Sequence, residues 1–249
     1  MSELLVYTVT AGWYRDYVPL FKRCLFLQYP EYDCIVSELD IDDNDEALIA
    51  SSIRFLAEPE TDCPYIFITD IDMMPLRQDP SILKFHVDEM KESGLCYSNS
   101  IRGSEPLGDH RITGLHFVNK EWYRKTEQAR ADYMKQVNSG SGLIRYEDEM
   151  MLKQIVLKSG LEMCGGTNLV KRHGGIHLGT IRAYRWKTRQ TLSTQLTHRI
   201  PKSQALAWLS NYEDKEFCEI EKETRAKNQQ IDWHLDRLNQ YCQKKRNSP

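Results

Sequence analysis

Strand-like and helix-like segments alternate through the first three quarters of the chain. Five short apolar runs predict strands, at residues 4–9, 34–39, 65–68, 95–98 and 112–118. The amphipathic segments between them predict helices, with Asn44 and Asn119 as starts and Gly160 as a C-terminal cap. We therefore expect a mostly parallel central sheet flanked by helices. After about Thr194 the pattern is wholly helical. These patterns predict an α/β domain at residues 1–194 and a helical C-terminal extension at residues 195–249 that packs on it.

The apolar run Tyr65–Ile68 is followed by Thr69-Asp70-Ile71-Asp72, which places two carboxylates just beyond a buried strand. Residues two apart on a strand point the same way, and ligands of open α/β sheets bind at the carboxyl ends of the strands. Paired carboxylates suit Mg²⁺ or Mn²⁺, which can in turn hold a diphosphate. The structural alternative is that the two acids only open a turn before Pro75.

A second group of candidate residues lies in a stretch without acids. Between Met163 and Tyr212 there are eight basic residues and no acidic one. Within it, His173 and His177 flank Gly174-Gly175, and a histidine beside glycines can approach a ligand closely. An imidazole added to two carboxylates shifts preference toward Mn²⁺. The nearby Lys171, Arg172 and Arg182 supply cations that a diphosphate needs.

A third candidate is the acidic start of the helix predicted at residues 147–159. Acids in a first helical turn are favoured by the helix dipole, which is the structural explanation for Glu147 and Asp148. The functional alternative is that one of these carboxylates serves as a general base.

Taken in order, these motifs resemble those of nucleotide-sugar-dependent glycosyltransferases of the GT-A fold. The shared marks are Asp70-Ile71-Asp72, Thr113-Gly114-Leu115, Tyr146-Glu147-Asp148 and His177. Arg54, sixteen residues before Asp70, matches an arginine of glycogenin-like members that meets the sugar and diphosphate. The segment Thr8-Val9-Thr10-Ala11, followed by Tyr14, is similar to their first-strand uridine site. The resemblance covers roughly residues 4 to 186.

The resemblance implies a role for each matching position. Asp70 and Asp72 would bind the metal and ribose, with His177 as the third protein ligand. Asp148, beside Glu147, would deprotonate the acceptor hydroxyl in an inverting enzyme. The donor, a UDP-sugar by preference, would also contact Thr8, Thr10, Ala11, Tyr14, Arg54, Ile71 and Arg182. The cofactor would be Mn²⁺ or Mg²⁺, and the acceptor a glycan, a lipid-linked sugar or a protein.

The late histidine motif departs from the glycogenin-like pattern. The segment from His177 to Arg182 is one residue shorter than that pattern, and Arg182 replaces a lysine. The sequence therefore leaves open whether His173 or His177 meets the metal, and whether the enzyme inverts or retains the anomeric centre.

Two other functions use the same residues. A haloacid-dehalogenase-like phosphatase would use Asp70 as nucleophile and Asp72 as general acid, although Met74 stands where that motif has Thr or Val. A non-catalytic scaffold would bind a sugar nucleotide without turning it over.

Composition narrows the setting in which the protein acts. The net charge of −3, from 33 Lys+Arg and 36 Asp+Glu, argues against a general nucleic-acid binder. Seven cysteines without a C-x-x-C pair favour reduced thiols and a cytoplasmic location. No apolar run approaches the roughly 18 residues of a membrane span.

The remaining expectations concern loops and the C-terminal extension. Residues 99–110 are glycine- and proline-containing and predict a lid over the donor. The C-terminal helix is expected to pack on the domain or on a second subunit, or to dock a partner. Its basic end, Lys244-Lys245-Arg246, is a candidate for peripheral contact with anionic lipid. Core packing is the expected role of Trp122, Trp186 and Trp208, with stacking on a sugar as the alternative. A structural role is likewise expected for His110 and His116, with a place in the acceptor pocket as the alternative.

Overall fold

The computed structural model describes residues 2–40, 46–100, 112–139, 147–164, 175–178 and 200–247. The chain divides into two compact units. The first comprises Met1–Gly12, Tyr32–Asp70 and Ile82–Arg172. The second comprises Trp13–Glu31, Ile71–Ser81 and His173–Pro249. The predicted boundary at residue 194 falls outside the described ranges and stays a prediction.

The first unit is built on a five-stranded sheet with the order β2-β1-β3-β6-β5. Strand β1 (Leu4–Ala11) pairs in parallel with β2 (Asp33–Leu39) and β3 (Tyr65–Ile68). Strand β6 (His116–Asn119) is antiparallel to both β3 and β5 (Tyr97–Ser98). Of these five strands, β6 therefore runs against the other four, and the predicted mostly parallel sheet is confirmed.

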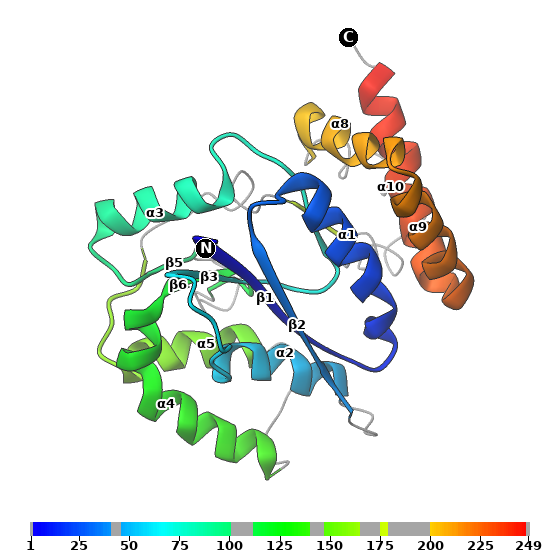
Figure 1. Ribbon diagram of the computed structural model, residues 1–249. Helices are drawn as coiled ribbons and strands as arrows, with labels where there is room; N and C mark the ends of the chain where they lie inside the picture. The colour runs from blue at the N-terminus through cyan, green and yellow to red at the C-terminus, as the bar shows by residue number, and fades with distance from the viewer. Residues whose placement is uncertain are drawn as a thin grey trace, which may run out of the picture. The chain divides into compact units, whose positions relative to one another are not determined.

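Helices cover both faces of this sheet (Figure 1). On one face lie α2 (Glu46–Leu56), α4 (Lys120–Asn138) and α5 (Glu147–Lys158), which form the main apolar core with alternate residues of β1 and β3. On the other face lies α3 (Ile82–Ser93), whose buried His86 stacks on Phe117 of β6 with ring centroids 4.8 Å apart. Alternation of side chains along each strand supplies both contacts.

Local signals account for several helix ends. The Asn119 side chain accepts hydrogen bonds from the backbone N–H groups of Glu121 and Trp122, so it caps α4 as the sequence predicts. Gly94 and Gly160 follow α3 and α5 with φ of +70° and +68°, a backbone conformation in which glycine has no Cβ penalty. The predicted cap of α2, Asn44, lies outside the described residues.

The strand predicted at residues 112–118 is shorter in the structure and begins at His116. The backbone N–H of Thr113 donates to Asn99 Oδ1 at 3.1 Å and to Ser100 O at 3.0 Å. Its hydroxyl also donates to Asn99 Oδ1, at 2.7 Å. The Asn99 side chain thus binds both the N–H and the hydroxyl of Thr113, a contact that the apolar pattern alone does not reveal.

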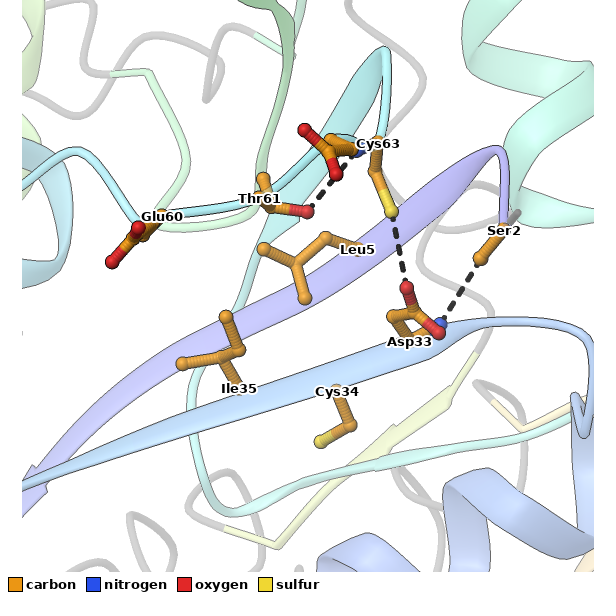
Figure 2. Close-up of a pocket in the computed structure, with 9 residues that line it drawn as sticks. Ser2, Leu5, Asp33, Cys34, Ile35, Glu60, Thr61 and Cys63 are labelled. Atoms are coloured by element: carbon orange, nitrogen blue, oxygen red, sulfur yellow. Dashed lines mark hydrogen bonds between the residues drawn. The ribbon is translucent and has the colours of Figure 1, made fainter.

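A cavity of about 420 Å³ opens at the amino-terminal ends of β1 and β2 (Figure 2). Cys63 Sγ lies 3.4 Å from Asp33 Oδ2, and the Asp33 N–H donates to Ser2 Oγ at 3.2 Å. The D-x-D motif begins beyond the carboxyl end of β3. The cavity therefore lies at the amino-terminal ends of the parallel strands. The ligand site that the sequence predicts lies at their carboxyl ends.

The second unit combines an early helix, a small sheet and the C-terminal helices. Its elements are η1 (Gly12–Tyr17), α1 (Val18–Gln28), β4 (Met73–Pro75), β7 (Gly175–His177), α8 (Lys202–Ser210), η4 (Asn211–Glu213), α9 (Lys215–Lys227) and α10 (Gln229–Asn247). The first residue of η1, Gly12, belongs to the first unit. Strands β4 and β7 pair antiparallel. The wholly helical pattern predicted after residue 194 is confirmed for residues 202–247. No described helix is both long enough and apolar enough to cross a membrane.

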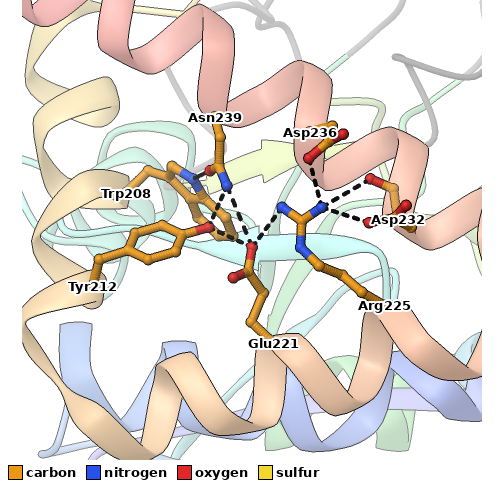
Figure 3. A network of polar contacts seen from close by, with 7 residues as sticks. All are labelled: Trp208, Tyr212, Glu221, Arg225, Asp232, Asp236 and Asn239. Carbon is orange, nitrogen blue, oxygen red and sulfur yellow. Dashed lines mark hydrogen bonds and ion pairs between the residues drawn. The ribbon is translucent and has the colours of Figure 1, made fainter.

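Polar side chains join the C-terminal helices (Figure 3). Arg225 of α9 forms ion pairs with Glu221 at 2.9 Å and with Asp232 and Asp236 of α10, each at 2.7 Å. The buried Trp208 of α8 donates from Nε1 to Asn239 Oδ1 of α10 at 2.7 Å. Trp208 is thus a core residue, as is the fully buried Trp122 of the first unit. Trp186 lies outside the described residues.

Helix α1 contacts both the segment after the D-x-D motif and the C-terminal helices. The Gln28 side chain donates to Asn211 Oδ1 at 2.6 Å and accepts from the backbone N–H of Arg77 at 3.1 Å. The neighbouring Tyr29 hydroxyl donates to Leu76 O at 2.9 Å. Both Gln28 and Asn211 are buried. The C-terminal helices therefore share one folded unit with the segment that carries Asp72.

A double-mutant cycle tests this link. We expect Gln28→Ala and Asn211→Ala each to lower the free energy of unfolding by about 1–3 kcal/mol, because each leaves a buried polar partner unsatisfied. The loss in the double variant should be smaller than the sum of the two single losses, by about 0.5 kcal/mol or more. The reason is that the second deletion removes a group that already lacks its partner. Urea unfolding followed by circular dichroism measures all four proteins. Additive losses would contradict a direct interaction between the two amides.

Candidate functional site

Asp72 and His177 are brought together by the pairing of β4 with β7. Met73 is the register partner of His177, and the Leu178 N–H donates to Asp72 O at 2.9 Å. His177 Nε2 lies 3.1 Å from Asp72 Oδ1. The Asp72 side chain is 10% exposed and that of His177 is 30% exposed. An aspartate and a histidine separated by 105 positions in the sequence thus form a partly accessible pair (177 − 72 = 105).

Gly175 makes this pairing sterically feasible. A Cβ built at Gly175 would lie 2.4 Å from Met74 O, a backbone atom that cannot swing away. The sequence suggested that the glycines beside the histidines open space for a ligand. The structure gives Gly175 another role, since the space is taken by the neighbouring strand. His173 and Gly174 lie outside the described residues.

Asp70, at the end of the first unit's β3 segment, pairs with a buried arginine. Arg54 of α2 forms ion pairs with Asp70 and, at 3.0 Å, with Asp148 of α5. The Arg54 side chain is 3% exposed, whereas Asp70 is 29% and Asp148 16% exposed. Burial acts to lower the pKa of Arg54, but the charges of Asp70 and Asp148 outweigh it and the pKa lies above its ordinary value. The guanidinium is therefore a permanent positive charge between two carboxylates.

Gly114 and Glu149 complete the surroundings of Arg54. The Gly114 N–H donates to Glu149 Oε1 at 3.2 Å, and Glu149 is buried. A Cβ at Gly114 would lie 2.7 Å from Arg54 Nη2. Gly114 thus leaves room for the guanidinium, which explains the glycine in the predicted strand. The sequence did not predict that Glu149 would accept this hydrogen bond. Three consecutive acids at a helix start give no signal that tells which of them is buried.

The predicted nucleotide-site residues of β1 are buried. Thr8, Thr10 and Ala11 are each at most 1% exposed, and Ala11 faces the core shared with α2, α4 and α5. The hydroxyls of Thr8, Thr10 and Thr69 have no hydrogen-bond partner among the described residues. Unsatisfied buried hydroxyls are uncommon. Thr8 and Thr10 lie in the carboxyl-terminal half of β1, and Thr69 directly follows β3.

Tyr14 and Ile71 belong to the second unit. Tyr14 lies in η1, where its ring centroid is 4.0 Å from that of Trp13 and 6.1 Å from that of Tyr17. Ile71 is buried, so its side chain contributes to packing.

His116 is a core residue. It is fully buried, and burial lowers its pKa to about 3, so the imidazole is neutral. Asn99 Nδ2 lies 2.9 Å from His116 Nδ1, and the ring meets Trp122 edge-on at 4.9 Å. This contradicts a place for His116 in an acceptor pocket and agrees with the expected structural role.

Several predicted site residues lie outside the described part of the chain. They include Arg182, Lys171, Arg172, His110 and residues 101–110 of the predicted lid. Glu147 begins α5, but its side chain is not among those described.

Comparison with known proteins bears on the fold. No family model and no curated protein matches the sequence. Among solved structures, the glycosyltransferase GlyE of Streptococcus pneumoniae TIGR4 aligns with a TM-score of 0.50 and 10% identity, over 96% of this chain and 64% of GlyE. This chain has the GT-A fold. The predicted fold class is thereby confirmed, whereas identity this low carries no substrate or residue role with it.

Two further solved structures align over a smaller part of this chain. One is a glycosyltransferase involved in glycosylation of the major capsid of PBCV-1, with a TM-score of 0.43 and 13% identity, over 66% of this chain and 79% of that chain. The other is the galactosyltransferase LgtC in complex with donor and acceptor sugar analogues, with a TM-score of 0.43 and 13% identity, over 70% and 84%.

Gly175→Ala tests the role of the β4–β7 pairing. We expect it to lower the free energy of unfolding by about 1–3 kcal/mol, because the new methyl group overlaps Met74 O. For the metal site that the sequence predicts at Asp72 and His177, we also expect the variant to weaken Mn²⁺ binding by about tenfold or more, since the Asp72–His177 pair depends on this pairing. Calorimetric titration with MnCl₂ and urea unfolding measure the two effects.

Gly94→Ala is a matched control. Its φ of +70° strains an alanine, although a Cβ there meets nothing within 4 Å. We expect a loss of about 1 kcal/mol and unchanged Mn²⁺ affinity. Equal metal affinities for the two variants would show that the small sheet does not position the pair.

Proposed function

We propose that the protein is a metal-dependent glycosyltransferase that moves a sugar from a nucleotide-diphosphate donor to an acceptor hydroxyl. The observation that carries the proposal is the Asp72–His177 pair in a chain with the GT-A fold. Asp72 is the second aspartate of the D-x-D motif, two residues after Asp70. The fold alone would also suit a protein that only binds sugar nucleotides. An aspartate and a histidine aligned by a small sheet add the chemistry that such transfer requires.

Asp70, Asp72 and His177 are the proposed metal ligands. Two carboxylates and one imidazole fit Mn²⁺, with Mg²⁺ as the alternative. The cation would neutralise charge on the diphosphate as it leaves. The pairing of Met73 with His177 fixes the backbone that carries both Asp72 and His177. The two side chains are therefore held in place before a metal or a donor binds.

The donor is proposed to be a UDP-sugar. Support comes from the unsatisfied hydroxyls of Thr8 and Thr10, which a polar ligand or ordered water would complete. The same proposal assigns donor contacts to Ala11, Tyr14, Arg54, Ile71 and Arg182. Since Ala11 and Ile71 have buried side chains, only their backbone groups suit this role.

The proposed base is Asp148, with Glu147 as the neighbouring candidate. Arg54 holds the Asp148 carboxylate at 3.0 Å, which fixes its orientation while leaving its side chain 16% exposed. A base must be accessible to the acceptor hydroxyl, and this exposure permits it. The acceptor is proposed to be a glycan, a lipid-linked sugar or a protein, and the location cytoplasmic. Peripheral membrane contact and a homo-oligomer through the C-terminal helix stay proposals.

A nucleotide-sugar panel tests the function. We expect one donor, a UDP-sugar, to raise the melting temperature with Mn²⁺ present and to be hydrolysed slowly without acceptor. Asp72→Asn should abolish both effects, because a neutral amide supplies none of the negative charge that a carboxylate offers the cation. Hydrolysis of a sugar phosphate instead would favour a phosphatase. Binding of a sugar nucleotide without turnover, with or without candidate acceptors, would indicate a scaffold.

Asp148→Asn tests the proposed base. The variant keeps the shape of the side chain and loses the proton acceptor, so we expect kcat to fall by about 10²–10⁴-fold. Initial rates with the donor from the panel and an acceptor provide the measurement. A kcat within about tenfold of the wild type would exclude general-base catalysis by this residue.

A further inference from the structure

We infer that Arg54 is a built-in competitor of the divalent cation: it occupies Asp70 in the metal-free protein and limits how tightly the cation binds. The inference rests on the proposed function only in taking Asp70 as a metal ligand. It concerns the affinity of the cation, which is measurable without any sugar donor.

The first argument is the position of the guanidinium. Arg54 forms its ion pair with Asp70 through Nη1 and its ion pair with Asp148 through Nη2. A carboxylate has two oxygens, so Asp70 can accept Arg54 on one and a cation on the other. Both positive charges would then lie within a few ångströms of each other, and their repulsion would lower the affinity of the cation.

The second argument is that Arg54 has little freedom to move aside. Its side chain is 3% exposed, and a Cβ at Gly114 would already lie 2.7 Å from Nη2. The guanidinium carbon lies 4.6 Å from the centre of the Phe55 ring, on the apolar side of α2. A surface arginine could swing into water when a cation arrives. Arg54 is confined by packing, and its charge stays beside Asp70.

The third argument is the charge balance of the cluster. Arg54 is in direct contact with the carboxylates of Asp70 and Asp148. With both carboxylates ionised, these three groups sum to −1 (one positive and two negative charges). Without Arg54 the sum would be −2, which would attract a cation more strongly and leave two like charges to repel each other. Arg54 thus stabilises the metal-free state and weakens cation binding at the same time.

Substitution of Arg54 tests the inference. Arg54→Gln removes the charge and keeps amide donors for the carboxylates, so we expect the dissociation constant for Mn²⁺ to fall by about tenfold or more. Arg54→Lys is the matched control, because it keeps a positive charge at the same place; its dissociation constant should stay within about threefold of the wild type. Calorimetric titration with MnCl₂ alone, on samples whose native circular dichroism is verified, supplies the values.

A measurement on the wild-type protein covers the case in which Arg54→Gln fails to fold. The Nε of Arg54 is buried and has no hydrogen-bond partner among the described residues, so its N–H signal in nitrogen-15 NMR reports on the guanidinium. We expect this signal, assigned by its absence in Arg54→Lys, to shift on titration with diamagnetic Mg²⁺. The midpoint of the shift should equal the calorimetric dissociation constant for Mg²⁺.

The outcomes separate the inference from the proposed function. If the wild type binds Mn²⁺ and folded Arg54→Gln binds it no more tightly, the competitor role is wrong while the metal site stands. An Arg54 signal that does not move while Mg²⁺ binds would overturn the inference in the same way. If the wild type binds neither cation, the metal assignment and the inference that depends on it both fail.

Discussion

The ion pairs of Arg54 join three segments of the first unit that are distant in the sequence. Helix α2 carries the arginine, the end of the β3 segment carries Asp70, and the start of α5 carries Asp148. Isolated charges are costly to bury, and removing one member of a buried network leaves the others uncompensated. Gly114 gives the guanidinium room, and its N–H binds Glu149 beside Asp148. The placement of the candidate carboxylates Asp70 and Asp148 therefore depends on the buried guanidinium of Arg54.

In the second unit the corresponding constraint is the close pairing of β4 with β7. A peptide oxygen of Met74 occupies the space that any side chain at position 175 would need. Strand pairing in turn sets Asp72 beside His177. Helix α1 supports the segment just after β4 through Gln28 and Tyr29, and Gln28 also binds Asn211 beyond α8. The C-terminal helices thus fold together with the segment that carries Asp72, which gives them a structural role.

The sequence predicts those features of the fold and site that depend on local patterns. Alternating apolar runs placed β1 and β3, and Asn119 and Gly160 marked helix ends, because caps and strand periodicity act over a few residues. The D-x-D motif indicated the edge of the sheet at which to look. Contacts between distant segments were beyond these patterns: the partners of Arg54, the role of Gly175 in strand pairing, and the hydrogen bonds of the Asn99 side chain to Thr113. Each depends on tertiary packing that local periodicity does not encode.

The two aspartates of the motif have different partners. Asp70 faces a guanidinium that is always charged, whereas Asp72 faces an imidazole that is itself a candidate ligand. Neighbouring carboxylates repel one another, and positive charges beside them relieve that repulsion. Arg54 supplies such a charge beside Asp70, and His177 Nε2 lies 3.1 Å from Asp72 Oδ1, so each carboxylate has a defined neighbour. On the proposed function, Arg54 would lower the affinity of the cation by charge repulsion, whereas His177 would change from a partner of Asp72 to a ligand beside it.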